Sequence, residues 1–212
     1  MVELNVKFGI ENLYGGDGFE REVPREVEVF QVKKSKEVER YGNVSLDDAT
    51  EKTKKVVIDK IQTFKIDGNG KHTQRLGGAH GKLWGSLRAT GIYLVECGNE
   101  ILLKHGIKSM AGVKRMMGVI NLSPTYPELN GFKKEEIWVD EIPQIMNGMN
   151  KGMVIQRFDV IPKSECDMKI MIPDRYKEVV KELLRAQEDI STLNKRRSTV
   201  KVLKIKENGK KD

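Results

Sequence analysis

The sequence predicts an α+β fold with strands at both ends of the chain, and three observations support this prediction. Residues 2–10 alternate apolar and polar side chains, which is the pattern of a strand with one buried face. Residues 82–96 and 176–190 instead carry apolar side chains at helical spacing. Residues 137–161 are typical of a long hairpin. The resulting order, β-α-β-β-α-β, is that of a ferredoxin-like fold.

The length suits one decorated domain, residues 1–212, which can bury a core without disulfides. The first strand ends at a glycine-rich turn over residues 14–18, and residues 23–32 predict a second, weaker strand. Residues 33–70 are polar and predict an insertion, with a short helix that begins after the cap residue Ser45.

The second half of the chain supplies the remaining elements. We expect a strand over residues 113–122. After the hairpin, a turn at residues 162–164 leads to a short strand over residues 166–172, and the second helix follows. The last strand is predicted over residues 199–206, and the basic tail from 206 to 212 is expected to fray.

The charge distribution indicates a partner that carries negative charge. The chain has 38 Lys and Arg against 31 Asp and Glu, a net charge of +7. Residues 71–120 and residues 190–212 each hold eight basic and two acidic side chains. Two such basic segments favour a polyanion, most often a nucleic-acid backbone. The alternative is the Lys- and Glu-rich solvated surface of a thermophilic protein.

Several classes of protein are excluded by composition. Cys97 and Cys166 have no CxxC partner, so neither a disulfide framework nor a zinc site is indicated, and a reducing, cytoplasmic location is expected. The sequence shows no signal peptide and no apolar stretch long enough to span a membrane. The motifs GxxxxGK[ST], GxGxxG, HExxH and GxSxG are absent. We therefore predict no metal, no cofactor and no membrane partner.

A glycine-punctuated segment, residues 71–81, leads directly into the first predicted helix. A loop with free backbone N–H groups at a helix N-terminus is a natural cradle for anions, and arginine adds bidentate charge. An ordinary loop with a solvated helix face is the alternative. The expected phosphate-binding residues are Arg75, Lys82 and Arg88, with Gly77, Gly78 and Gly81.

The segment HGKLWGSLR, residues 80–88, resembles the G-S-S-L-K-G-x-x-R segment of the RAMP superfamily, the RNA-binding subunits of CRISPR effector complexes. Leu83, Gly85 and Arg88 take the places of the Leu, the second Gly and the Arg of that motif. Further along, residues 139–142 and 158–170 resemble the family's I-D-R and E-x-V-P-x-G-x-x-F-x-F-x-I segments. The resemblance spans most of the chain and is weakest over its first third.

The sequence departs from the family pattern in several places. His80 stands where the family usually has Gly, and Trp84 where it often has Lys. Ser164 and Glu165 occupy the region of the usual Gly-Thr turn. The loop of residues 190–199 is basic where the family has a glycine-rich loop. The motifs also do not separate a repeated backbone subunit from a single-copy cap.

The resemblance implies a non-catalytic RNA-binding subunit of a CRISPR ribonucleoprotein for antiviral defence. Its partners would be guide RNA, target nucleic acid and other effector subunits, which can include copies of itself. Base identity would be left to pairing between guide and target. The implied RNA-binding residues are Lys71, His72, Arg75, Gly77, Gly78, His80, Gly81, Lys82, Arg88, Lys195, Arg196 and Arg197.

The resemblance also assigns a role to the hairpin over residues 139–155. Ile145, Met146 and Met149 at its tip resemble the family's thumb, which wedges into the duplex of guide and target. A subunit contact or simple core is the alternative. Trp84 and Trp138 are predicted to stack on bases or to lie in the core.

No catalytic residue is assigned. Asp17 lies in the region where target-cleaving family members keep a metal-dependent Asp, but Asp47, Asp48 and Asp67 compete for that role. Two other function classes stay open. One is a metal-independent guide-processing endoribonuclease that uses His72 or His80. The other is a cap or accessory protein-interaction subunit without strong RNA binding of its own.

Overall fold

The computed structural model describes residues 1–32, 49–146, 152–190, 192–193 and 198–208. The chain divides into two compact units. The main unit comprises Met1–Phe19 and Gln62–Asp212, and the ribbon unit comprises Glu20–Ile61. The fold is α+β, as predicted, and none of the helices in the described parts is long and apolar enough to cross a membrane.

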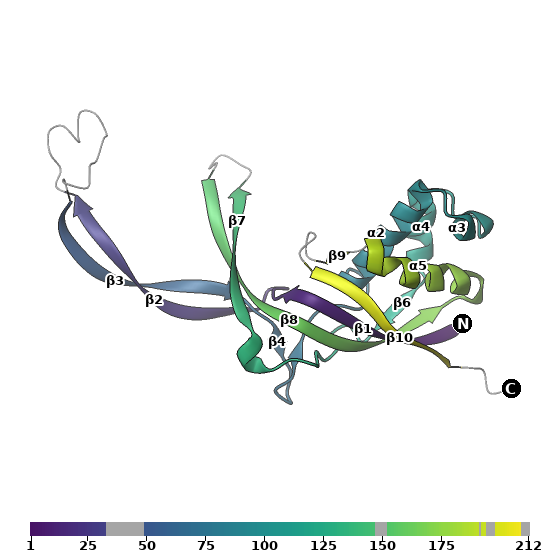
Figure 1. Cartoon of the computed structure of the whole chain (residues 1–212), viewed down its shortest axis with the longest axis horizontal. Coiled ribbons are helices and arrows are strands. Elements are labelled where there is room, and N and C mark those ends of the chain that lie inside the picture. The colour runs from purple at the N-terminus through teal and green to yellow at the C-terminus, as the bar shows by residue number, and fades with distance from the viewer. Residues whose placement is uncertain (33–48, 147–151, 191, 194–197, 209–212) are drawn as a thin grey trace. The chain divides into compact units, whose positions relative to one another are not determined.

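The main unit is built on an antiparallel sheet with β1 (Val2–Tyr14) at its centre. β10 (Ser198–Asn208) pairs with one side of β1, and β8 (Gly152–Ile172) pairs with the other. Two strands, β6 (Asn121–Ser123) and β7 (Trp138–Met146), pair with different stretches of β8. The short β9 (Thr192–Leu193) pairs with the beginning of β10 (Figure 1).

Helices lie together over one face of this sheet (Figure 1). They are α2 (Lys82–Glu96), α3 (Glu100–Lys104), α4 (Met110–Met117) and α5 (Lys177–Ile190). The alternating side chains Leu4, Val6, Phe8 and Ile10 of β1 are buried in one core with apolar residues of α2, α4 and α5. On the opposite face of the sheet, the central residues of β1 are Asn5, Lys7, Gly9 and Glu11.

Smaller elements complete the main unit. Single-turn helices precede β7 and α5, and a two-residue hairpin precedes α2. Their bounds are η2 (Lys134–Glu136), η3 (Asp174–Tyr176), β4 (Lys65–Ile66) and β5 (His72–Thr73).

The ribbon unit consists of β2 (Glu20–Val32) and β3 (Ala49–Gln62), which pair with each other. Arg25 Nε lies 2.7 Å from Asp59 Oδ2. Two further ion pairs join Lys54 to Glu26 and Lys60 to Glu20, at 3.4 and 3.8 Å. Each of these three ion pairs joins a residue of β2 to a residue of β3.

The structure confirms the first and last strands, both long helices and the hairpin, but three predictions are wrong. The helix after Ser45 is not found over residues 49–62, which form β3, because Val56, Val57 and Ile58 are β-branched and favour strands. Residues 45–48 lie outside the described residues.

The strand predicted over residues 113–122 is mostly helix. Ser109 Oγ accepts a hydrogen bond from Gly112 N at 3.2 Å and caps α4, and Val113, Met116 and Met117 are buried at helical spacing. The turn predicted at residues 162–164 is absent, because β8 continues through it. Pro162, which has no N–H to donate, lies where β1 leaves regular pairing at Asn12 (φ 51°).

Candidate nucleic-acid interface

The loop of residues 74–81 connects β5 to α2 and contains the glycines singled out in the sequence. A Cβ atom on Gly77 would lie 2.3 Å from the carbonyl oxygen of Pro124, and one on Gly81 would lie 2.2 Å from that of Gly77. No side chain fits at such distances. The two glycines are therefore required by packing: the loop lies against residues 122–125 and folds back on itself.

The backbone N–H groups of this loop are largely used within the protein. Leu76 and Gly77 N–H donate to Thr125 O at 3.1 and 3.2 Å, and Gly78 N–H donates to Leu122 O at 2.7 Å. The N–H groups of residues 81–83 donate to Gly78, Arg75 and Leu76 oxygens. Most of the N–H groups that we expected to bind anions are therefore already bonded within the protein, which leaves the side chains as the main groups for a ligand.

Asp17 lies at the centre of the polar contacts around the loop. Its Oδ2 accepts hydrogen bonds from Gln74 Nε2 at 2.7 Å and from Arg75 N at 3.3 Å. Lys82 Nζ lies 3.9 Å from the same oxygen and donates to Tyr14 O at 3.1 Å. Asp17 and Lys82 therefore join the end of β1 to the beginning of α2.

The position of Lys82 changes its chemistry. Its side chain is only 17% exposed. Burial lowers the pKa of Lys82 to about 8, while the negative charge of Asp17 acts in the opposite direction. The Lys82 ammonium group thus points inward, whereas the sequence had suggested a group that faces phosphate.

Two buried polar atoms at this site have no hydrogen-bond partner, Gln74 Oε1 and Arg75 Nε. Arg75 Nη2 donates to Ala79 O at 3.3 Å, so the guanidinium group lies along the loop. Buried polar atoms normally find partners, so these two are candidates for contact with a ligand. Gln74 is not among the predicted site residues, because no local pattern distinguishes it from other polar loop residues.

Three predicted residues, His80, Trp84 and Arg88, lie close together at the beginning of α2. Trp84 Nε1 donates to Met117 O at 3.2 Å, which fixes the indole against α4. The Arg88 guanidinium lies 5.8 Å from the centre of the Trp84 ring, and the His80 ring lies 6.1 Å from it. His80 is exposed and has a positive φ of 72°. The side chains of Arg88 and His80 therefore both lie beside the Trp84 ring.

His72 lies in different surroundings. Its ring is 6.3 Å from that of Phe64 and 5.5 Å from that of Phe132. Burial lowers the pKa of His72, and the positive charge of Lys134 lowers it further. Neighbouring Lys71 is exposed, and its N–H donates to Asp67 Oδ1 at 2.8 Å in the preceding turn. His72 is therefore held neutral between aromatic rings, where it is poorly placed to act as a general acid.

The second basic segment, Lys195, Arg196 and Arg197, lies outside the described residues. The residues on either side of it are placed. Ser198 Oγ donates to Asn12 O at 2.6 Å, near the end of β1, and β9 packs against α2. The residues on either side of this segment are therefore anchored on β1, which leads to Asp17, and on α2, which begins with Lys82.

The predicted thumb is a regular hairpin whose β7 and β8 pair from Trp138↔Val160 to Met146↔Gly152. Met149 lies outside the described residues, and the side chains of Ile145 and Met146 are not described either. At its base, Tyr14 Oη donates to Asp140 Oδ2 at 2.7 Å. Trp138 is 44% exposed and so does not belong to the core.

Comparison with known proteins does not identify a relative. No protein-family model matches the chain. No curated protein matches it significantly.

Proposed function

We propose that this chain is an RNA-binding subunit of a CRISPR ribonucleoprotein effector complex, built on the ferredoxin-like fold of the RAMP superfamily. The order of the sheet carries this proposal. It runs β10-β1-β8-β6 and every neighbouring pair is antiparallel. Along the chain these elements come in the order β1, α2, β6, β8, α5 and β10, which agrees with the β-α-β-β-α-β arrangement.

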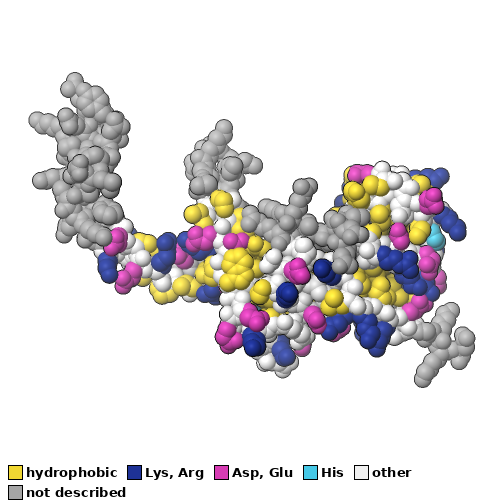
Figure 2. Space-filling view, in the orientation of Figure 1, with side chains coloured by type: hydrophobic (Ala, Val, Ile, Leu, Met, Phe, Trp, Pro, Cys, Tyr) yellow, Lys and Arg dark blue, Asp and Glu magenta, His cyan; other side chains and the backbone are white. Residues whose placement is uncertain are grey.

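The position of the RAMP-like motif supports the proposal. Residues 80–88 end the glycine-containing loop and form the first turns of α2, beside the end of β1. Arg75, His80 and Arg88 lie at or near the surface there, and the anchors of the second basic segment lie on the same elements. Figure 2 shows Lys and Arg side chains at several places on the surface of the main unit. Together these cations provide a surface for a phosphate backbone.

The side chains on the face of the sheet opposite the helices indicate which mode of RNA binding is disfavoured. RNA-recognition domains stack bases on aromatic side chains of the sheet. The corresponding side chains of β1 include Asn5, Lys7, Gly9 and Glu11, and their partners on β8 are Lys163, Glu165, Asp167 and Lys169. None of these is aromatic. Binding through phosphates is therefore favoured over sequence readout by stacking on aromatic rings.

Affinity for a fluorescent single-stranded RNA of about 40 nucleotides, measured at several salt concentrations, tests the proposal. We expect the affinity to fall steeply with salt. In Arg75→Ala/Arg88→Ala it should fall about tenfold or more, with a shallower salt dependence, because two phosphate contacts are lost.

Lys114→Ala/Arg115→Ala is the matched control, because it removes the same charge from the exposed side of α4. Its affinity should stay close to that of the wild type. Equal losses of affinity in both variants would mean that RNA binding depends on the total charge of the protein and not on Arg75 and Arg88. Absence of RNA binding by the wild type would contradict the proposed function and favour a protein-interaction subunit.

A further inference from the structure

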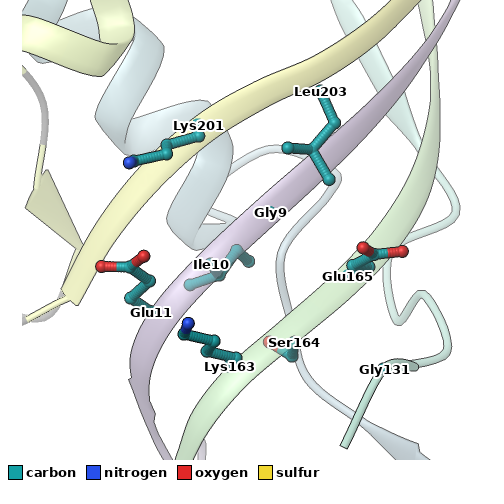
Figure 3. A pocket seen from close by; sticks show the side chains of 9 residues that line it. All are labelled: Gly9, Ile10, Glu11, Gly131, Lys163, Ser164, Glu165, Lys201 and Leu203. Carbon is teal, nitrogen blue, oxygen red and sulfur yellow. The ribbon is translucent and has the colours of Figure 1, made fainter.

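A groove of about 220 Å³ lies on the sheet face opposite the helices, above Gly9 of β1 (Figure 3). Its walls come from all three central strands. Glu11 continues β1, Lys163 and Glu165 come from β8, and Lys201 and Leu203 come from β10. Gly131, in the loop before β7, forms one lip.

The fold itself does not require glycine at position 9. A glycine inside a strand costs about 0.5–1 kcal/mol relative to alanine, so it needs a reason. Gly9 has no positive φ, and the three atoms nearest to a Cβ atom there would be Cγ, Cδ1 and Cδ2 of Leu203, at 3.2–3.3 Å. Leu203 is 50% exposed and sits at an irregularity in the pairing of β1 with β10, so it can turn aside. A glycine that packing can spare is typical of a place where a ligand approaches the backbone.

The size of the groove limits the ligand to one ring system. Clefts that hold a whole small molecule usually measure about 300–1,000 Å³, and this groove is smaller. It is also open, so its occupant can be one part of a larger molecule. Gly9 is partly exposed and has no side chain, so the backbone of β1 forms the floor of the groove there, and Leu203 gives one apolar wall.

The charged side chains at the rim of the groove favour some ligands over others. Glu11 and Glu165 offer hydrogen-bond acceptors, and Lys163 and Lys201 offer donors (Figure 3). Glu165 also pairs with Lys7 at 2.5 Å, and Thr199 Oγ1 donates to Glu11 Oε2 at 3.2 Å. The two carboxylates balance the charges of Lys163 and Lys201, so the rim offers a phosphate no net attraction. An apolar protein side chain would cover charged groups without pairing them, which is costly. A nucleobase carries donors and acceptors on the edge of a flat ring, and so matches both the floor and the rim.

We propose that the groove over Gly9 holds one nucleobase of a bound single-stranded RNA, laid on the backbone of β1 and bonded at its edge by the rim. The inference rests on the proposed function, since it takes RNA as the bound polymer. It adds a contact that the phosphate-binding surface does not contain, on the opposite face of the sheet from the helices.

Filling the groove from below tests the inference. Gly9→Val adds a side chain that suits a strand, and should lower affinity for the RNA about tenfold, the cost of one lost base contact. Asn5→Val is the matched control, because it places the same side chain on the same face of β1, further from the groove. It should bind as the wild type does. Leu203→Ala removes the apolar wall at an exposed position and should weaken binding severalfold without affecting folding.

The stability of Gly9→Ala is measured in parallel by thermal unfolding. An unchanged or higher melting temperature supports the argument that folding can spare this glycine. A marked decrease would explain Gly9 by its packing against Leu203, and would overturn the inference. Wild-type affinity in Gly9→Val, together with lost affinity in Arg75→Ala/Arg88→Ala, would also overturn it while leaving the proposed function intact.

If the wild type does not bind RNA, the groove is tested with adenosine monophosphate alone. Shifts of the Gly9 and Leu203 amide resonances in the wild type, absent in Gly9→Val, would support a base site even though the proposed function had failed. No shift at those amides would overturn both.

Discussion

The main unit and the ribbon unit differ in their net charge and in how their charged side chains are paired. Residues 20–61 contain ten Lys and Arg and ten Asp and Glu, so all seven net positive charges belong to the main unit. Three ion pairs join the two strands of the ribbon, whereas in the main unit Arg75 and Arg88 lie at or near the surface and Lys82 is largely buried. Charge density alone therefore does not indicate a polyanion surface. What matters is whether the cations are already neutralised by neighbouring carboxylates.

The units differ equally in how they are stabilised. The main unit has a continuous apolar core beneath its helices, while Val56 and Ile58 of the ribbon are 58% and 55% exposed. A two-stranded ribbon buries little surface and gains little from any one side chain.

Removing core volume should separate the units most clearly. Leu87→Ala empties a position that is 1% exposed in the main core, and should lower the free energy of unfolding by about 3 kcal/mol. Ile58→Ala in the ribbon should cost less than about 1 kcal/mol, because its side chain already contacts water. Urea unfolding followed by circular dichroism measures both. Equal costs would mean that the ribbon contributes to a core of comparable strength.

A second contrast lies within the loop and helix that form the candidate interface. Gly77→Ala should destabilise the protein by about 2 kcal/mol or more, because the new Cβ would meet backbone atoms that cannot move aside. Gly85→Ala should stabilise it by about 0.5–1 kcal/mol, because nothing lies within 4 Å and alanine favours the helix. The two melting temperatures should move in opposite directions. If Gly77→Ala is tolerated, the packing of the loop on residues 122–125 is looser than described.

The buried cation of the main unit predicts a pH dependence. Because burial lowers the pKa of Lys82 from 10.5 to about 8, the unfolded chain binds this proton more tightly than the folded chain. The resulting penalty is complete below the folded pKa and fades as the pH rises toward the unfolded one. Relative to Lys82→Met, the wild type should therefore gain about 2 kcal/mol of stability between pH values of about 8 and 10. Parallel stability curves for the two proteins would show that the Lys82 ammonium group is not desolvated.

The regions that were predicted well have signals that are local in the sequence. β1 was predictable because a strand with one buried face alternates apolar and polar residues. α2 was predictable because Leu83, Leu87 and Leu94 recur at helical spacing. Residues 113–122 misled because a short helix is followed at once by apolar residues that enter β6. Periodicity over so few residues does not separate the two structures.

The candidate site was predictable only in part for the same reason. Arg75, His80, Lys82 and Arg88 are near one another because they are near in sequence. The use of the loop N–H groups depends on oxygens of Leu122 and Thr125, and the inward position of Lys82 depends on Tyr14 and Asp17. These partners come from distant parts of the chain, so no local sequence pattern predicts them.

The exposed lysines of the ribbon should contribute little to RNA affinity. Lys54→Ala/Lys60→Ala removes two charges, as Arg75→Ala/Arg88→Ala does, but Glu26 and Glu20 lie beside these lysines and offset their attraction for phosphate. RNA affinity in the ribbon variant should therefore change by less than about twofold, with an unchanged salt slope. Fluorescence anisotropy at the same series of salt concentrations compares the two variants directly. A loss as large as that of the arginine variant would mean that RNA follows the ribbon as well, and that neutralisation by neighbouring carboxylates does not decide where this chain binds a polyanion.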